Sequence, residues 1–242
     1  MSEPDLAGQT VVLIGGSAGI GLETARRARA EGAEVILAGR NPERLDKAAN
    51  ELGAKSTAAF DANDTAAVEA FFADLEGPID HVLATAGGPY YAPLAEMDFD
   101  RARSALAEHP MLMLGVARYG APKVRPGGTL LFMGGTGGRR PSAGSIISAG
   151  TAALPALTAS LALEIAPVRI NLIAAGFVDT PLSASLLGDQ LEARRRQLRD
   201  TLPIGRVVGP DDVAALALHL MVNTALTGAT YDIDGGQQLV PA

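Results

Sequence analysis

The sequence predicts a doubly wound α/β fold, in which helices cover both faces of a parallel sheet of about seven strands. Short runs rich in β-branched and apolar residues alternate with longer segments of helical period, as in successive βαβ units. No linker-like segment interrupts this alternation. The length of 242 residues, of which 48% are hydrophobic, suits a single domain spanning residues 1–242 with a sizeable core.

The elements follow from local pattern and from turn residues. Strands are expected at TVVLIG, EVILAG, STAAF, IDHVLAT, GTLLFMG, VRINLIAAG and ATYDID. Helices are expected at IGLETARRARAEG, NPERLDKAANELG, TAAVEAFFADL, a long segment from about Phe99 to Gly120, AALPALTASLALEIA, DQLEARRRQLRD and PDDVAALALHLM. Asn41 and Pro42 are typical of an N-cap and a first turn. Pro155 removes a backbone hydrogen bond, which predicts that its helix is bent or begins late.

The composition excludes several classes of protein. Zero cysteines exclude disulfides, thiolate metal sites and cysteine nucleophiles. A net charge of −7 argues against a phosphate-backbone binder. The acidic start MSEPDLAGQT lacks the layout of a signal peptide, and a charge, Pro or Gly interrupts each long apolar run. We expect a cytoplasmic protein with no metal site, no nucleic-acid partner and no membrane association.

A glycine-rich turn, IGGSAGIG, joins the first strand to the first helix at residues 14–21. Gly15 permits the tight turn, Gly19 lets the backbone approach a pyrophosphate, and Gly21 lets the helix pack closely on the strand. Exposed amides at the helix start attract the anion. The alternative is a plain turn between strand and helix with no ligand.

The spacing G-x-x-x-G-x-G resembles the short-chain dehydrogenase/reductase family, and the resemblance continues along the chain. ATAG at 84–87 stands where the family has Asn-Asn-Ala-Gly, and DGG at 234–236 resembles its C-terminal motif. AAGFVDTPL at 174–182 resembles the segment that contacts the nicotinamide, with Ala175 in place of proline. The resemblance implies a Rossmann-type domain that binds a nicotinamide dinucleotide.

Arg40, at the end of the second strand, indicates which dinucleotide is bound. An acidic residue there would bind the ribose hydroxyls of NAD, whereas a guanidinium binds the 2′-phosphate of NADP(H). We therefore predict NADP(H) ahead of NAD(H), and the alternative is a solvated loop arginine. Asp61 resembles the family's adenine-contacting aspartate, and its alternative role is the N-cap of the helix near Thr65. The predicted cofactor-binding residues are Gly15, Ser17, Gly19, Ile20, Gly21, Arg40, Asn41, Asp61, Ala62, Ala86, Gly87, Gly176, Val178 and Thr180.

The catalytic residues that the resemblance implies are missing, which makes this an atypical member. The family uses a serine, a tyrosine and, four residues later, a lysine, with an asparagine on the preceding long helix. Register anchored on both sides places Gly135, Ile147 and Thr151 at the first three positions. The asparagine corresponds to Leu106 or His109, depending on a gap. Ile147 cannot donate a proton, and Thr151 cannot imitate an ammonium.

Four residues are weaker candidates for the acid. Tyr90, beside Tyr91, follows the fourth strand, although lid or packing roles are the commoner reading. His109 is a candidate proton carrier near neutral pH, but a histidine before a proline in a helix can simply mark a kink. Thr136 and Ser148 can hydrogen-bond a substrate oxygen or cap a turn.

Two functions compete. The first is an NADP(H)-dependent oxidoreductase with a non-standard active site, acting on a small, rather apolar substrate. The alternative is a non-catalytic dinucleotide-binding sensor or assembly subunit, and non-redox chemistry in the same cleft is a third reading. The resemblance also implies a homo-oligomer, a tetramer or dimer, formed through the two long helices beside the active site.

Overall fold

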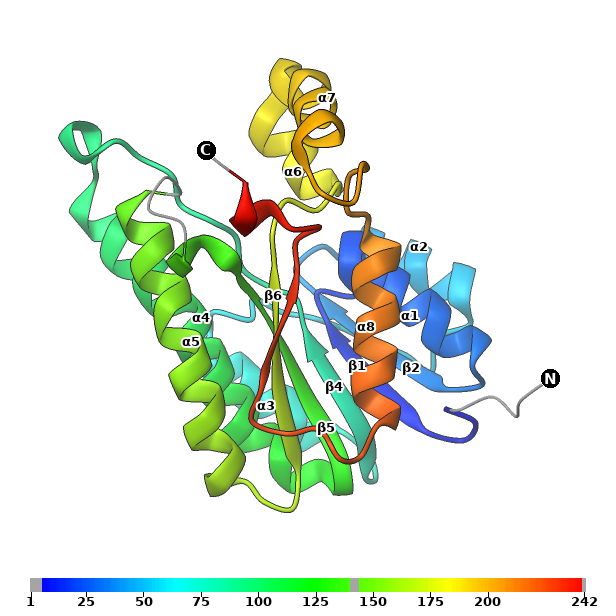
Figure 1. The fold of residues 1–242 in the computed structure, drawn as a ribbon. Coiled ribbons are helices and arrows are strands. Elements are labelled where there is room, and N and C mark those ends of the chain that lie inside the picture. Colours follow the sequence, from blue (N-terminus) through cyan, green and yellow to red (C-terminus); the bar gives the residue numbers. More distant parts are fainter. Residues whose placement is uncertain (1–5, 140–143, 241–242) are drawn as a thin grey trace.

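A computed structural model describes residues 6–139 and 144–240. Its centre is one sheet of seven parallel strands in the order β3-β2-β1-β4-β5-β6-β7 (Figure 1). The strands are β1 Thr10–Ile14, β2 Glu34–Gly39, β3 Ser56–Ala59, β4 Ile79–Ala84, β5 Val124–Gly135, β6 Arg169–Ala175 and β7 Thr230–Ile233. The α-helices are α1 Gly19–Ala30, α2 Pro42–Leu52, α3 Thr65–Asp74, α4 Phe99–Gly120, α5 Ser145–Glu164, α6 Pro181–Leu187, α7 Leu191–Thr201 and α8 Pro210–Val222. The predicted doubly wound fold is confirmed.

Each face of the sheet carries its own apolar core. Val12 and Ile14 of β1 pack in a core with α3, α4 and α5, whereas Val11 and Leu13 pack in a core with α1, α2 and α8. Figure 1 shows α4 and α5 on one side of the sheet and α1 and α8 on the other. Burial on both faces explains why the central strands are almost continuously apolar, as is usual in parallel sheets.

Polar side chains begin two of the helices that border the candidate site. Asn41 Oδ1 accepts the backbone N–H of Arg44 at 2.9 Å, and Pro42 follows it, which confirms the predicted N-cap of α2. Asp64 caps α3 by accepting two backbone amides. Asp61 accepts a backbone amide within the preceding turn. The alternative that Asp61 caps α3 is therefore wrong.

Pro155 lies inside α5 without delaying its start. The helix begins at Ser145, so the prediction of a late start is wrong. A proline inside a helix costs about 3 kcal/mol, and the burial of Leu154, Thr158 and Leu161 against the sheet offsets this cost. Among the described residues, α5 is the one helix that length and composition alone would allow to cross a membrane.

His81 of β4 is buried at the end of the sheet opposite the candidate site. Its Nε2 lies 2.6 Å from Gln9 Oε1, and its buried Nδ1 has no hydrogen-bond partner among the described residues. Burial lowers the pKa of His81 to about 4, with Arg169 acting in the same direction and Asp80 opposing them. The folded protein therefore holds this imidazole neutral.

We predict that His81 makes the protein less stable in mild acid. Because its pKa is about 4 when folded and 6.5 when free, the unfolded chain binds a proton that the folded chain does not. The free energy of unfolding should then fall between pH 6.5 and 4, by about 3 kcal/mol at most. Urea unfolding of His81→Gln should show a flatter dependence on pH over this range. The exposed His219→Gln serves as control, and equal slopes for His81→Gln and the wild type would contradict the prediction.

Candidate active site

The predicted cofactor residues all follow the carboxyl ends of strands. They lie after β1, β2, β3, β4 and β6, and these ends share one edge because the strands are parallel. The chain reverses its direction of travel across the sheet at β1, which has β2 on one side and β4 on the other. Ligands of doubly wound proteins bind at such a point. No group of three His, Cys, Asp or Glu side chains in residues 6–139 and 144–240 could hold a metal ion.

The glycine turn after β1 passes very close to Thr85, at the end of β4. Thr85 donates its backbone N–H to the Ile14 carbonyl at 2.8 Å. A Cβ on Gly15 or Gly21 would overlap with Thr85 Oγ1, and Gly15 also has a φ of +97°. Glycine is therefore needed at both positions. As a result, a ligand beyond the turn meets backbone rather than side chains.

The start of α1 has the features of an anion site. Ala18 occupies the N-cap without a side-chain hydrogen bond, and the first turn holds no acidic residue. Gly19 has a φ of +55°, and its Cβ position lies 3.6 Å from the side chain of Thr180, so the segment after β6 closes over the helix start. Backbone amides and the helix dipole favour negative charge there. A pyrophosphate fits this cradle.

Arg40 lies at the neighbouring corner, directly after β2, and its side chain is exposed. Ser17 Oγ lies 3.4 Å from the Cβ position of Gly39, the residue before Arg40. The hydroxyl of Ser17 therefore lies close to the backbone that carries the Arg40 guanidinium. The carboxamide oxygen of Asn41 is already engaged as the N-cap of α2. Arg40 and Ser17 are therefore better placed than Asn41 to bind a phosphate.

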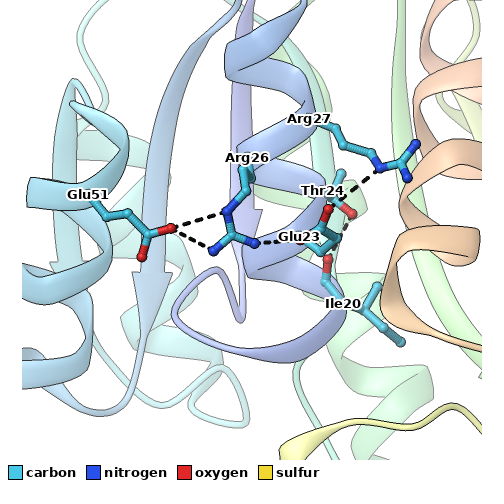
Figure 2. A network of polar contacts seen from close by, with 6 residues as sticks. All are labelled: Ile20, Glu23, Thr24, Arg26, Arg27 and Glu51. Atoms are coloured by element: carbon cyan, nitrogen blue, oxygen red, sulfur yellow. Dashed lines mark hydrogen bonds and ion pairs between the residues drawn. The ribbon is translucent and has the colours of Figure 1, made fainter.

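An ion-pair network joins the helices that begin at this corner (Figure 2). Arg26 of α1 pairs with Glu51 of α2 at 2.6 Å and with Glu23 of its own helix. Arg27 lies 3.6 Å from Glu23 on the other side. Exposed pairs contribute at most about 1 kcal/mol each. The network therefore links α1 to α2 but contributes little to the stability of the fold.

His109 of α4 lies against the segment that follows β4. Its Cε1 and Nε2 are 3.1 Å from the position of a Cβ on Gly87. Burial lowers the pKa of His109 from its ordinary 6.5, and Glu108 opposes this effect. Leu106 instead lies toward α5, 3.9 Å from the Cβ position of Gly150. Of the two positions proposed for the family's asparagine, His109 is the one beside a predicted cofactor segment.

The positions of the missing catalytic residues meet where β5 leads into α5. The Cβ position of Gly135 is 3.3 Å from Thr151 Cγ2. Thr151 Oγ1 donates to the Ile147 carbonyl at 2.7 Å, and Ser148 Oγ donates to the Gly137 carbonyl at 3.2 Å. Both hydroxyls therefore donate to backbone carbonyls, Thr151 within α5 and Ser148 to the turn that precedes it. None of these side chains is an acid near neutral pH.

A pocket of about 250 Å³ lies beside these positions and is lined by residues 90–93 and 144–147. Ile147, at the family's tyrosine position, and Tyr90 both line it. Thr136 is only 1% exposed and does not line it. A larger hollow of about 410 Å³, between β3 and α3, contains none of the predicted site residues. The smaller pocket is therefore the candidate substrate site.

Other residues that shape the cleft were missed by the sequence analysis. Gln237 is 3% exposed, and its Oε1 accepts the backbone N–H of Phe177 at 2.8 Å, which holds the segment after β6. Arg195 of α7 pairs with Asp179 of that segment at 2.7 Å. Thr85 ties β4 to β1. Thr85 lies within the ATAG motif at 84–87 and Gln237 directly follows DGG at 234–236, and these positions are the sequence signals that could have indicated them.

Comparisons with known proteins agree with this geometry. A family model described as enoyl-(acyl carrier protein) reductase matches residues 15–238. The short-chain dehydrogenase/reductase ATR9 of Stachybotrys chlorohalonatus is 30% identical, covering 96% of this chain and 98% of its own. The structure of MalC, a reductase/Diels-Alderase of Malbranchea aurantiaca, has a TM-score of 0.88 and 25% identity, covering 99% of this chain and 100% of its own. BdcA in complex with NADPH has a TM-score of 0.84 and 27% identity, covering 96% and 95%.

The family model covers nearly the whole chain, from the glycine turn to the end of the sheet. The doubly wound parallel sheet and the glycine turn at the start of α1 are those expected from the motifs. This chain therefore belongs to the short-chain dehydrogenase/reductase family of oxidoreductases.

Proposed function

We propose that this protein is an NADP(H)-dependent oxidoreductase with a non-standard active site, acting on a small and rather apolar substrate. The observation that carries the proposal is a pocket between the start of α5 and residues 90–93, which belong to the same segment after β4 as the predicted cofactor residues Ala86 and Gly87. The glycines of the cradle are required by close contacts, and Ile147 lines the pocket where the family has its tyrosine. The complex of BdcA with NADPH supports the cofactor.

The absence of the family's tyrosine and lysine limits which substrates react well. NADPH supplies a hydride, and reduction of a ketone then requires a proton on the oxygen. A positioned general acid contributes about 10²–10⁴ in rate. An iminium cation needs no proton, because hydride addition turns it directly into a neutral amine. The site should therefore favour substrates that are already activated.

We predict that the protein oxidises NADPH with N-methyl-3,4-dihydroisoquinolinium faster than with 1-tetralone, a ketone with the same bicyclic skeleton. The loss of absorbance of NADPH measures both rates. Ile147→Tyr combined with Thr151→Lys should raise the ketone rate, because it restores the phenol and the ammonium. No turnover of either compound would refute the proposal and favour the non-catalytic alternative, provided that calorimetry shows NADPH to be bound.

Arg40 should decide the preference for NADPH. Arg40→Ala removes a charge-assisted contact to the 2′-phosphate, so the affinity for NADPH should fall about 10–100-fold. The affinity for NADH, which lacks this phosphate, should change little. Calorimetric titration measures both, and Lys47→Ala on α2 is the control for the loss of one positive charge. An equal loss of affinity for the two cofactors would contradict this role.

The outer face of α4 and α5 supports self-association, as a dimer or tetramer. Met111 and Leu114 of α4 and Leu163 of α5 are among the exposed large apolar residues. Alanines fill much of the exposed face of α5, and Figure 1 shows α4 and α5 side by side on the outside of the sheet. A second copy would cover an apolar surface of this kind.

We predict that Ala156→Glu, on the exposed face of α5, lowers the oligomeric state. It places a charge that would have to be desolvated in the interface. Light scattering after size-exclusion chromatography measures the molar mass. Ala66→Glu, in the exposed first turn of α3, should keep the wild-type mass. An unchanged mass for Ala156→Glu, or a monomeric wild type, would contradict the proposed interface.

A further inference from the structure

We propose that Tyr90 is the proton donor of this site, replacing the tyrosine that α5 lacks. The inference rests on the proposed function, because it assigns a residue to that reaction. Tyr90 lines the same pocket as Ile147, the residue at the family's tyrosine position. It therefore brings the lost functional group to the same pocket from the segment that follows β4.

Two contacts fix the ring of Tyr90 against the start of α4. The backbone N–H of Asp98 donates to Tyr90 Oη at 3.2 Å. The guanidinium carbon of Arg101 lies 4.9 Å from the centroid of the Tyr90 ring. Because Oη already accepts this N–H, its own hydrogen can be donated elsewhere. The same backbone N–H can hydrogen-bond the oxygen after it has released its proton.

The other candidates are less well placed. Tyr91 also lines the pocket, but it is 63% exposed, so water competes for its hydroxyl. His109 does not line the pocket, and burial lowers its pKa, which leaves it neutral near pH 7. Thr136 is buried away from the pocket, and Ser148 is an aliphatic alcohol bonded to a backbone carbonyl. Tyr90 is the phenol held at the pocket.

The proposed step balances as follows for a ketone. The carbonyl carbon receives the hydride that NADPH supplies, and NADP⁺ remains. The C=O double bond becomes a single bond, and the oxygen takes the proton from Tyr90 Oη to complete the alcohol. The phenolate then recovers a proton from water. Arg101 is a positioning residue, because it acts through the ring of Tyr90.

Tyr90→Phe tests the step while keeping the ring over Arg101. The ratio of kcat for 1-tetralone to kcat for N-methyl-3,4-dihydroisoquinolinium should fall by about 10²–10⁴, because only the ketone needs a proton. The affinity for NADPH should stay at the wild-type value. Tyr119→Phe, on α4 away from the pocket, is the matched control. An unchanged ratio for Tyr90→Phe, or a fall that follows Tyr91→Phe instead, would overturn the assignment.

A second readout does not depend on turnover. The chain has four tyrosines, and labelling them with ¹³C at Cζ gives one signal each, which substitution by phenylalanine assigns. Titration of the NADP⁺ complex with 1-tetralone cannot lead to reduction. The Tyr90 signal should shift as the ketone binds, and the signals of Tyr119 and Tyr231 should stay in place. A Tyr90 signal that stays unchanged at saturating ketone would refute direct contact.

The outcomes separate this inference from the proposed function. If the wild type turns over neither compound, the proposed function fails. If it reduces the iminium ion but gives no detectable rate with the ketone, the oxidoreductase stands and Tyr90 is not its acid. If it reduces both and only the ketone depends on Tyr90, both proposals hold.

Discussion

The close approach of the glycine turn to Thr85 is the constraint on which the site depends. The turn can reach the end of β4 only because Gly15 and Gly21 carry no Cβ. This approach sets β1 against β4 at the point where the chain changes sides. It also fixes the start of α1 and the segment after β4, which carries Gly87 and then Tyr90. The cradle and one wall of the pocket therefore depend on the same contact between backbones.

The same constraint explains how the cofactor cradle and the catalytic group can evolve separately. The cradle is made of backbone, so its geometry depends on buried contacts within the fold. The catalytic positions on α5 are side chains at the start of that helix, where Ile147 and Thr151 are only half-buried. The residues that hold α5 on the sheet, Leu154 and Leu161, lie further along it. Replacing the catalytic side chains therefore need not disturb the fold.

The sequence predicted the features that depend on local pattern. The seven strands follow from apolar periodicity, and the N-cap of α2 follows from the residue types of Asn41 and Pro42. The predicted late start of α5 was wrong because the local rule for Pro155 yields to the burial of Leu154, Thr158 and Leu161 around it. By residue type, Asp61 and Asp64 could each cap α3. The backbone conformation of the turn between them decides that Asp64 is the cap. The contacts of Tyr90 could not be predicted, since they depend on how a long loop returns to the start of α4.

The position of Tyr90 has a consequence for how a ketone is held. In the family's arrangement the proton comes from α5, and the polar end of the substrate points to that helix. Here Ile146 and Ile147 line the pocket on the α5 side, and Tyr90 lines it on the side of the segment after β4. A ketone that receives its proton from Tyr90 must therefore turn its oxygen toward that segment rather than toward α5.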